Sequence, residues 1–242
     1  MPCYNEAQRL NTRTFEEFFV ANEDINWIFV NDGSTDSTLG MLEALAKRHA
    51  LKIFVFDLQP NQGKAEAVRQ GLLQAYQNGK DELIGFWDAD LATPLEAISE
   101  MVDVLRQNQD IEMVFGSRVK LLGRKIQRKV VRHYLGRVFA TVVSMLLHLP
   151  IYDTQCGAKI FRSSEEIAGV LSKRFISRWV FDVEILARLL KARDFQASSL
   201  ESAIYELPLR KWEDVAGSKV KPADFFKALW EVWMIRWTYL RH

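Results

Sequence analysis

Two aspartates one residue apart, Asp88 and Asp90, are the residues of this chain best suited to chemistry. They directly follow an apolar run, residues 83–87, which predicts a buried strand. Ligands of open α/β sheets bind at the carboxyl ends of strands, so the pair stands where a ligand would bind. Close carboxylates repel each other unless a cation lies between them, and oxygen ligands of this kind suit Mg²⁺ or Mn²⁺ bridged to a substrate phosphate. A plain solvated turn is the alternative explanation of the triplet.

A second polar cluster ends the strand predicted at residues 25–30. It reads NDGSTD at residues 31–36, and a helical apolar pattern follows it. Gly33 permits a sharp turn, which leaves Asp32 at the strand end, where it can accept a hydrogen bond from a base or a ribose. The alternative is an Asx-type turn that binds nothing.

Three further motifs complete an ordered set along the chain: PCYNE at residues 2–6, DTQCGAKIFR at 153–162 and RWVFDVE at 178–184. Together with NDGSTD, DAD and a late stretch ending in Gly217-Ser218-Lys219, they resemble the inverting, GT-A-fold glycosyltransferases of family 2. The resemblance runs from residue 2 to about residue 240. DTQCG and FDVE are its selective parts, and they resemble the dolichyl-phosphate (polyprenyl-phosphate) β-glucosyltransferase branch. Related mannosyltransferases usually carry a different segment at 153–157, and often a Gln where this chain has Ala92.

The resemblance implies a nucleotide-sugar donor, most simply UDP-glucose. Tyr4 and Glu6 would contact base and ribose, Asp32 would contact the base, and Asp88 and Asp90 would hold Mg²⁺ or Mn²⁺ against the diphosphate. A divalent cation there would stabilise the charge that grows on departing UDP. Lys64 opens a helix and could favour the diphosphate, although a solvated lysine explains it equally well. The residues expected around the donor, of which the last three would shape the sugar pocket, are Pro2, Tyr4, Glu6, Val30, Asp32, Lys64, Asp88, Ala89, Asp90, Asp153, Gln155 and Trp179.

Two stretches of the second half predict contact with a membrane surface. Residues 118–137 carry eight Lys or Arg and no acidic residue, and an apolar segment at 138–149 follows. Such a pattern favours an anionic head group in an interface, with a solvated basic helix as the alternative. Near the C-terminus, helical spacing places six apolar side chains on one face, which suits the headgroup region or, alternatively, a core contact. They are Phe226, Leu229, Trp230, Trp233, Trp237 and Leu240.

The expected acceptor is a polyprenyl or dolichyl phosphate, which is already anionic at pH 7 and needs no general base. Arg118 and Arg132 are expected to hold its phosphate, because Arg binds phosphate bidentately. Direct displacement would invert an α-linked donor to a β-linked product. The expected catalytic residues are therefore Asp90, Arg118, Arg132 and, ambiguously, Asp182. Two alternatives stay open: a family 2 enzyme that uses Asp182 as base toward a sugar hydroxyl, and an inactive membrane-associated nucleotide-sugar binder.

The order of elements predicts the α/β class, with a mainly parallel sheet flanked by helices and interfacial helices near the C-terminus. One domain is expected over 1–242, with the donor half at 1–118 and the acceptor half at 119–242. No signal-peptide pattern and no apolar run long enough to span a bilayer occurs, so we expect a peripheral protein on the cytoplasmic face of a membrane. The expected strands are 25–30, 52–57, 83–87 and 112–116, with short ones near 159–162 and 202–207; the expected helices are 39–49, 64–78 and 95–107.

The start of the chain departs from the family pattern. In the family an apolar strand precedes the PxYNE motif, whereas here Met1 directly precedes Pro2. That strand is central in a nucleotide-binding half, and its loss would leave strand edges unpaired. We therefore expect a truncated first strand, and residues upstream of Met1 that belong to the functional protein.

Overall fold

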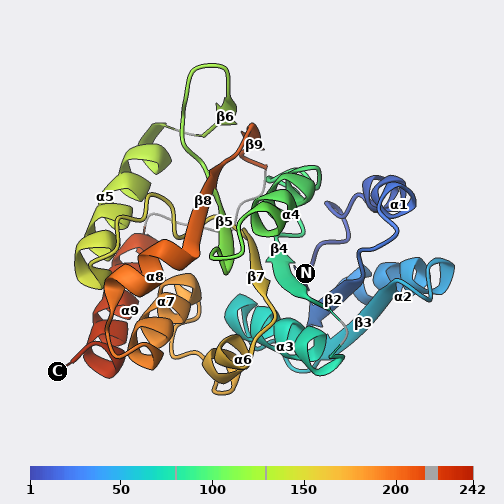
Figure 1. Ribbon diagram of the computed structural model, residues 1–242. Helices are drawn as coiled ribbons and strands as arrows, with labels where there is room; N and C mark the ends of the chain where they lie inside the picture. The colour runs from blue at the N-terminus through green and yellow to red at the C-terminus, as the bar shows by residue number, and fades with distance from the viewer. Residues whose placement is uncertain (80, 129, 216–222, 242) are drawn as a thin grey trace.

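The computed structural model describes residues 1–79, 81–128, 130–215 and 223–241, without the side chains of 130, 132, 223 and 224. Strands and helices alternate through the first half of the chain, as the sequence predicts (Figure 1). These elements are β1 (Pro2–Cys3), α1 (Thr12–Ala21), β2 (Trp27–Asp32), α2 (Thr38–Arg48), β3 (Ile53–Leu58), α3 (Lys64–Gln77), β4 (Leu83–Trp87), α4 (Ala97–Gln107) and β5 (Met113–Ser117). The second half is richer in helix: β6 (Lys125–Gln127), α5 (Val130–Leu147), β7 (Ala158–Arg162), α6 (Glu165–Leu171), α7 (Phe181–Ala192), α8 (Ala197–Ala203), β8 (Ile204–Pro208), β9 (Lys211–Glu213) and α9 (Ala223–Tyr239).

The strands form a parallel sheet of order β1-β2-β3, a mixed sheet of order β4-β7-β5-β8 and a small parallel pair, β6-β9. In the mixed sheet β7 lies between β4 and β5 and is antiparallel to both, while β8 is parallel to β5. The predicted α/β class with a mainly parallel sheet is confirmed. The sequence did not predict that β7 would enter between two strands that precede it in the chain.

The first strand is short but present. Pro2 and Cys3 pair with Val30 and Asn31 of β2, and the Met1 amino group donates to the carbonyl oxygen of Ile28 at 2.6 Å. This pairing places the PCYNE motif beside NDGSTD at one end of the parallel sheet. The expectation about residues upstream of Met1 stays a prediction.

Helix α1 is not among the helices predicted from the sequence. The Asn11 side chain caps it by accepting from the backbone N–H of Thr14 at 3.2 Å. Its buried Phe15 packs edge-on against Trp27 and Phe29 of β2, with ring centroids 6.0 and 5.4 Å apart. This aromatic cluster fixes β2, and hence Asp32 at its end.

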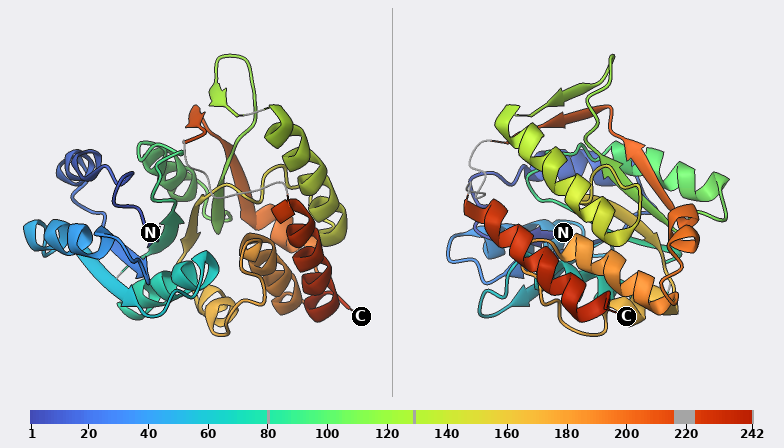
Figure 2. Two further views of the ribbon diagram at one scale, coloured as in Figure 1. Left: turned by 180° about the vertical axis from the view of Figure 1, so that it is seen from behind. Right: turned by 90° about the vertical axis from the view of Figure 1, so that its left-hand side faces the viewer.

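Helix α7 is the centre of the second half. Every residue from 181 to 190 is buried, as expected for a helix surrounded by protein on all sides. Helices α5, α6, α8 and α9 contact it, and α5 and α9 lie side by side on one face of the molecule (Figure 2, right). Within the residues that the structure describes, no helix has the length and apolar character needed to cross a bilayer.

Candidate active site

The DAD triplet follows β4, whose bounds agree with the predicted strand. The backbone N–H of Asp88 donates to the carbonyl oxygen of Gly157 at 2.9 Å, and its Oδ1 lies 2.6 Å from Nζ of Lys64. Asp90 accepts from the backbone N–H of Ala92 at 3.1 Å. Burial and the nearby charge of Asp88 raise the pKa of Asp90. The two carboxylates therefore repel each other, and Lys64 partly offsets their charge.

This pair fits a divalent cation of the Mg²⁺ or Mn²⁺ type. A cation bound there would relieve the repulsion that raises the pKa of Asp90. Among the described residues, no group of three or more His, Cys, Asp or Glu side chains is arranged to hold a metal. Substrate phosphate oxygens would have to complete the coordination of a cation at Asp88 and Asp90, which is common for Mg²⁺.

The two N-terminal motifs hold each other in place. The backbone N–H of Asn5 donates to Ser34 Oγ at 3.0 Å, and that of Glu6 donates to Thr38 Oγ1 at 2.8 Å. In return, Asn5 Oδ1 accepts from the backbone N–H of Thr35 at 2.8 Å. Tyr4 is 38% exposed beside this interlocked pair of loops, whereas Glu6 is buried against Arg9. Their contacts with base and ribose stay predictions.

Asp32 positions the loop that begins α3. Its Oδ1 accepts from the backbone N–H of Gln62 at 2.7 Å, and its Oδ2 accepts from Gly63 N–H at 2.9 Å and Asn61 Nδ2 at 2.8 Å. Asp32 is thus buried and uses both oxygens within the protein. It acts on the site by holding Lys64 in place, and a direct contact with the base stays a prediction.

Arg118 is engaged by Asp153 in a bidentate pair. Nε and Nη2 of Arg118 lie 2.6 and 2.7 Å from the two carboxylate oxygens, and the Arg118 backbone N–H adds a third bond at 3.1 Å. Burial disfavours the charge of Asp153, but Arg118 outweighs it and lowers the pKa of this carboxyl to about 2. The guanidinium edge expected to grip a lipid phosphate therefore holds the 153–157 loop, and phosphate binding by Arg118 stays a prediction.

The structure describes some, but not all, of the other residues expected near the acceptor and the sugar. Arg132 lies in α5, but its side chain is outside the described part of the chain, as are residues 217–219 of the late motif. Gln155 follows the Arg118-bound aspartate, and its backbone N–H donates to Asp153 Oδ1 at 3.2 Å. Trp179 is 43% exposed just before α7, and its backbone N–H donates to Glu231 of α9 at 3.2 Å. The expected roles of these residues in a sugar pocket stay predictions.

Asp182 lies in the first turn of α7 and is 6% exposed. Its Oδ1 is 2.5 Å from Nζ of Lys159, which is itself buried. Burial raises the pKa of Asp182, and the Lys159 ammonium opposes this shift. Three carboxylates and two ammonium groups are thus gathered from β4, α7, α3 and β7.

Three residues of this site were not assigned roles from the sequence, although each stands inside a quoted motif. Gly157 faces Asp88 so closely that a Cβ there would lie 1.9 Å from Oδ2. Lys159 is the partner of Asp182. Arg178 is exposed, and its Nε lies 3.3 Å from where a Cβ on Gly63 would be, over the start of α3. The only sequence signal for roles of Gly157, Lys159 and Arg178 in this site is that they lie within the DTQCGAK and RWVFDVE motifs.

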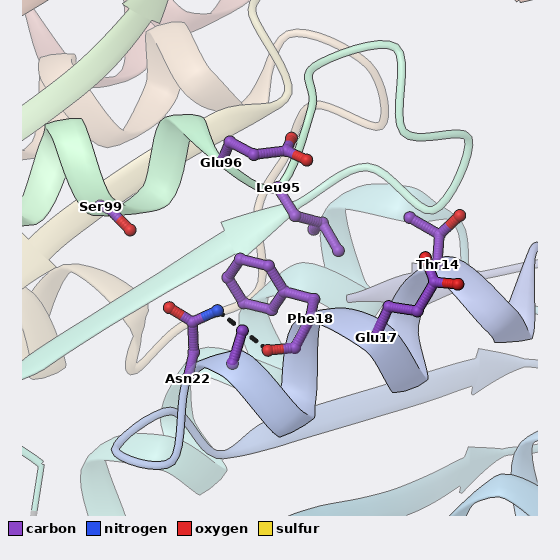
Figure 3. Close-up of a pocket in the computed structure, with 8 residues that line it drawn as sticks. Thr14, Glu17, Phe18, Asn22, Leu95, Glu96 and Ser99 are labelled. Carbon is purple, nitrogen blue, oxygen red and sulfur yellow. Dashed lines mark hydrogen bonds between the residues drawn. The ribbon is translucent and has the colours of Figure 1, made fainter.

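A cavity between α1 and α4 is separate from this cluster. Its volume is about 290 Å³, and Figure 3 shows the side chains around it. Glu17 and Glu96 both line it, so its charge does not suit an anionic donor. It shares no residue with the carboxylate cluster. Its lining is Thr14, Glu17, Phe18, Ala21, Asn22, Leu95, Glu96 and Ser99.

The sequence profile described as Glycosyl transferase family 2 matches residues 1–165. The chain belongs to glycosyltransferase family 2. This family 2 chain is 31% identical to the dolichyl-phosphate beta-glucosyltransferase of Dictyostelium discoideum, over 99% of this chain and 73% of that protein. It is 32% identical to the enzyme of the same name from Drosophila melanogaster, over 92% of this chain and 68% of that protein. It therefore spans about two thirds to three quarters of the length of such relatives.

Solved structures show the fold of this family 2 glycosyltransferase. Glucosyl-3-phosphoglycerate synthase from Mycobacterium tuberculosis, solved with Mn²⁺, UDP and glucosyl-3-phosphoglycerate, has a TM-score of 0.63 at 17% identity, over 97% of this chain and 77% of that one. A mannosyltransferase from Pyrobaculum calidifontis, solved with GDP-Man and Mn²⁺, has a TM-score of 0.56 at 15% identity, over 90% of this chain and 56% of that one. The expected GT-A fold is confirmed, and enzymes of this fold are found with a divalent metal and a nucleotide.

Proposed function

We propose that this chain transfers glucose from UDP-glucose to a dolichyl or other polyprenyl phosphate, with inversion. The names of the relatives, at about 30% identity over most of the chain, support both the sugar and the acceptor. In this reaction a phosphate oxygen of the lipid forms a bond to the anomeric carbon as the bond from that carbon to UDP breaks. The products are a β-linked glucosyl lipid phosphate and UDP.

The Lys159–Asp182 pair is the observation that carries this choice of acceptor. The carboxylate in the position of a family base is bound at 2.5 Å by a buried ammonium group, which occupies one of its oxygens and opposes the rise in its pKa that burial causes. A sugar hydroxyl needs such a base, but a lipid phosphate is already ionised at pH 7. The site is thus better suited to a phosphate nucleophile, with Asp182 orienting the sugar or a cationic side chain.

The residues proposed to bind the donor carry charges at the end of β4 and the start of α3. When bound at Asp88 and Asp90, a divalent cation supplies charge stabilisation to the leaving diphosphate. Lys64, which pairs with Asp88, and Arg178 lie at the N-terminus of α3, where both cations would face the diphosphate. Tyr4 and Glu6 bind the nucleoside, and Pro2, Val30 and Ala89 line it.

The acceptor side is a membrane-facing surface made by α5 and α9. On α9, Trp230 stacks on Trp233 and Trp233 stacks on Trp237, with centroids 4.9 and 5.7 Å apart, and all three are about half exposed. On α5 the exposed apolar residues include Val131, Tyr134, Val138 and Met145. Apolar and aromatic side chains beside the basic stretch 118–137 suit the interface of an anionic membrane, so the protein binds peripherally at the cytoplasmic face.

The face predicted on α9 is divided between the surface and the core. Phe226 and the three tryptophans are exposed, whereas Leu229 and Leu240 pack against the core beside buried Val232 and Ile235. The exposed aromatic side chains therefore fit the interpretation as a membrane contact, and the two leucines fit the interpretation as a core contact. Only Phe226 and the three tryptophans are available to a membrane.

The test is transfer of label from UDP-[¹⁴C]glucose, with Mn²⁺, to dolichyl phosphate or to soluble sugar acceptors in detergent. We expect label only in the lipid product. Transfer to a sugar hydroxyl alone would establish the second candidate, with Asp182 as base, which the burial-raised pKa of Asp182 favours. UDP-glucose binding without any transfer would establish the inactive binder. Asp182→Asn separates the first two, because it should retain partial activity only with an ionised acceptor.

A further inference from the structure

Lys159 uses all of its hydrogen-bonding capacity inside the protein. Nζ lies 2.5 Å from Asp182 Oδ1 and donates to the carbonyl oxygens of Thr154 at 2.9 Å and Cys156 at 2.7 Å. An ammonium group has three donors, and three acceptors surround this one. Its side chain is 1% exposed, so water cannot substitute for any of them.

The sheet fixes this ammonium in place. On β7, Lys159 pairs with Phe86 of β4 and with Phe115 of β5, so the three side chains are cross-strand neighbours. Nζ lies 5.4 and 5.0 Å from the centroids of the two rings, within the range of a cation–π interaction. The charge is therefore held by β7, one of the two inner strands of the mixed sheet.

The backbone that Lys159 binds leads directly to the donor side. Gly157 follows Cys156, and its carbonyl oxygen accepts from Asp88 N–H at 2.9 Å. The Gly157 Cα also faces the Asp88 carboxylate, because a Cβ there would lie within 2.6 Å of Oδ1, Oδ2 and Cγ. A shift of residues 154–157 would therefore move Asp88, to which Lys64 is bound.

We propose that Lys159 is a positioning residue, which holds Asp182 and the 154–157 loop in register with Asp88 and so aligns the acceptor and donor sides. The inference rests on the proposed function only for the roles of Asp88 and Asp182. A stability role alone does not explain such a pair, because apolar residues of similar volume often replace a buried ion pair without loss of stability.

The test compares variants that separate the two tasks of Lys159. Asp182→Asn keeps the ammonium bound to the loop, whereas Lys159→Met/Asp182→Leu removes both charges and leaves the carbonyl oxygens of Thr154 and Cys156 without the Lys159 donor. Calorimetry of Mn²⁺ with UDP-glucose measures the donor side without an acceptor. We expect affinity within threefold of wild type for Asp182→Asn and at least tenfold weaker for the double variant, both measured per folded molecule and below the melting transition of each variant. Lys159→Arg, which keeps the charge, should recover part of the loss.

A matched control removes another buried ion pair. Arg69 binds Glu66 within α3 at 2.6 Å, and both are 6% exposed. Arg69→Met/Glu66→Gln should alter the melting temperature but leave kcat per folded molecule and donor affinity unchanged. The proposal is overturned if the Lys159→Met/Asp182→Leu variant binds Mn²⁺ and UDP-glucose as wild type does, or loses no more affinity than this control. Absence of lipid transfer by the wild type would instead count against the proposed function, since the binding comparison needs no acceptor.

Discussion

A single methyl group at position 157 should disable the donor side of the site. In Gly157→Ala, the new Cβ would lie 1.9 Å from Asp88 Oδ2 and 2.2 Å from Cγ. The carboxylate must therefore move by about 1.5 Å, the difference between 1.9 Å and the 3.4 Å at which ordinary contact begins. That movement separates Asp88 from Lys64, 2.6 Å away, and misplaces a metal ligand.

The size of the effect follows from the displacement. A misplacement of about 1 Å can cost roughly 10²-fold in rate, so kcat/KM should fall by about 100-fold, or about 2.7 kcal/mol of transition-state stabilisation. Overpacking a filled site costs about 1–3 kcal/mol of folding stability, so the variant should still fold. Steady-state transfer, calorimetry with Mn²⁺ and UDP, and differential scanning calorimetry measure the three quantities.

Gly40→Ala is the matched control. A Cβ at Gly40, inside α2, would have nothing within 4 Å, so the change should stabilise the protein by about 0.5–1 kcal/mol and leave activity unchanged. Normal turnover and metal affinity in Gly157→Ala would refute the reasoning, because Asp88 would then not need its observed position.

Three further predictions concern other charges and surfaces. Because burial and Asp88 raise the pKa of Asp90, its ionisation destabilises the metal-free fold as pH rises through that pKa. Asp90→Asn should therefore raise the melting temperature at pH 7 without a cation. It should also abolish the shift in melting temperature that added cation causes and the turnover that a chelator inhibits. Arg118→Ala should cost about 3–5 kcal/mol in urea unfolding at pH 7, because Asp153 is left buried and unpaired; the wild-type contribution of this pair, present above pH 4, should disappear as pH falls through the Asp153 pKa of about 2. Replacing the exposed tryptophans of α9 by Ser should weaken cosedimentation with anionic vesicles while UDP-glucose binding persists, and unchanged sedimentation would remove α9 from the proposed surface.

Strands, helices and the residues at their ends could be predicted from the sequence, because they depend on residues that are close together in the chain. The apolar run at 83–87 ends at Asp88, so both the strand and the position of its carboxylates could be predicted. Helix α1 could also have been found, because Phe15, Phe18 and Phe19 have the spacing of one helical face.

Contacts between distant segments could not be predicted in this way. Arg118 was expected to bind phosphate, but its nearest anion is Asp153, which is 35 positions away in the chain and is brought close only by the fold. The Lys159–Asp182 pair likewise depends on β7 entering between β4 and β5, which no local periodicity encodes. Helical spacing gave the aromatic face of α9, but tertiary packing decided which of its side chains are covered.

The central claim is that an already ionised lipid phosphate is the nucleophile. The most direct measurement is the turnover of wild type and Asp182→Asn with UDP-[¹⁴C]glucose, Mn²⁺ and dolichyl phosphate, beside a soluble sugar acceptor. We predict Mn²⁺-dependent label in a β-linked glucosyl lipid phosphate, with measurable turnover remaining in Asp182→Asn. Transfer by the wild type to the sugar hydroxyl but not to the lipid phosphate, together with complete loss in Asp182→Asn, would contradict the account.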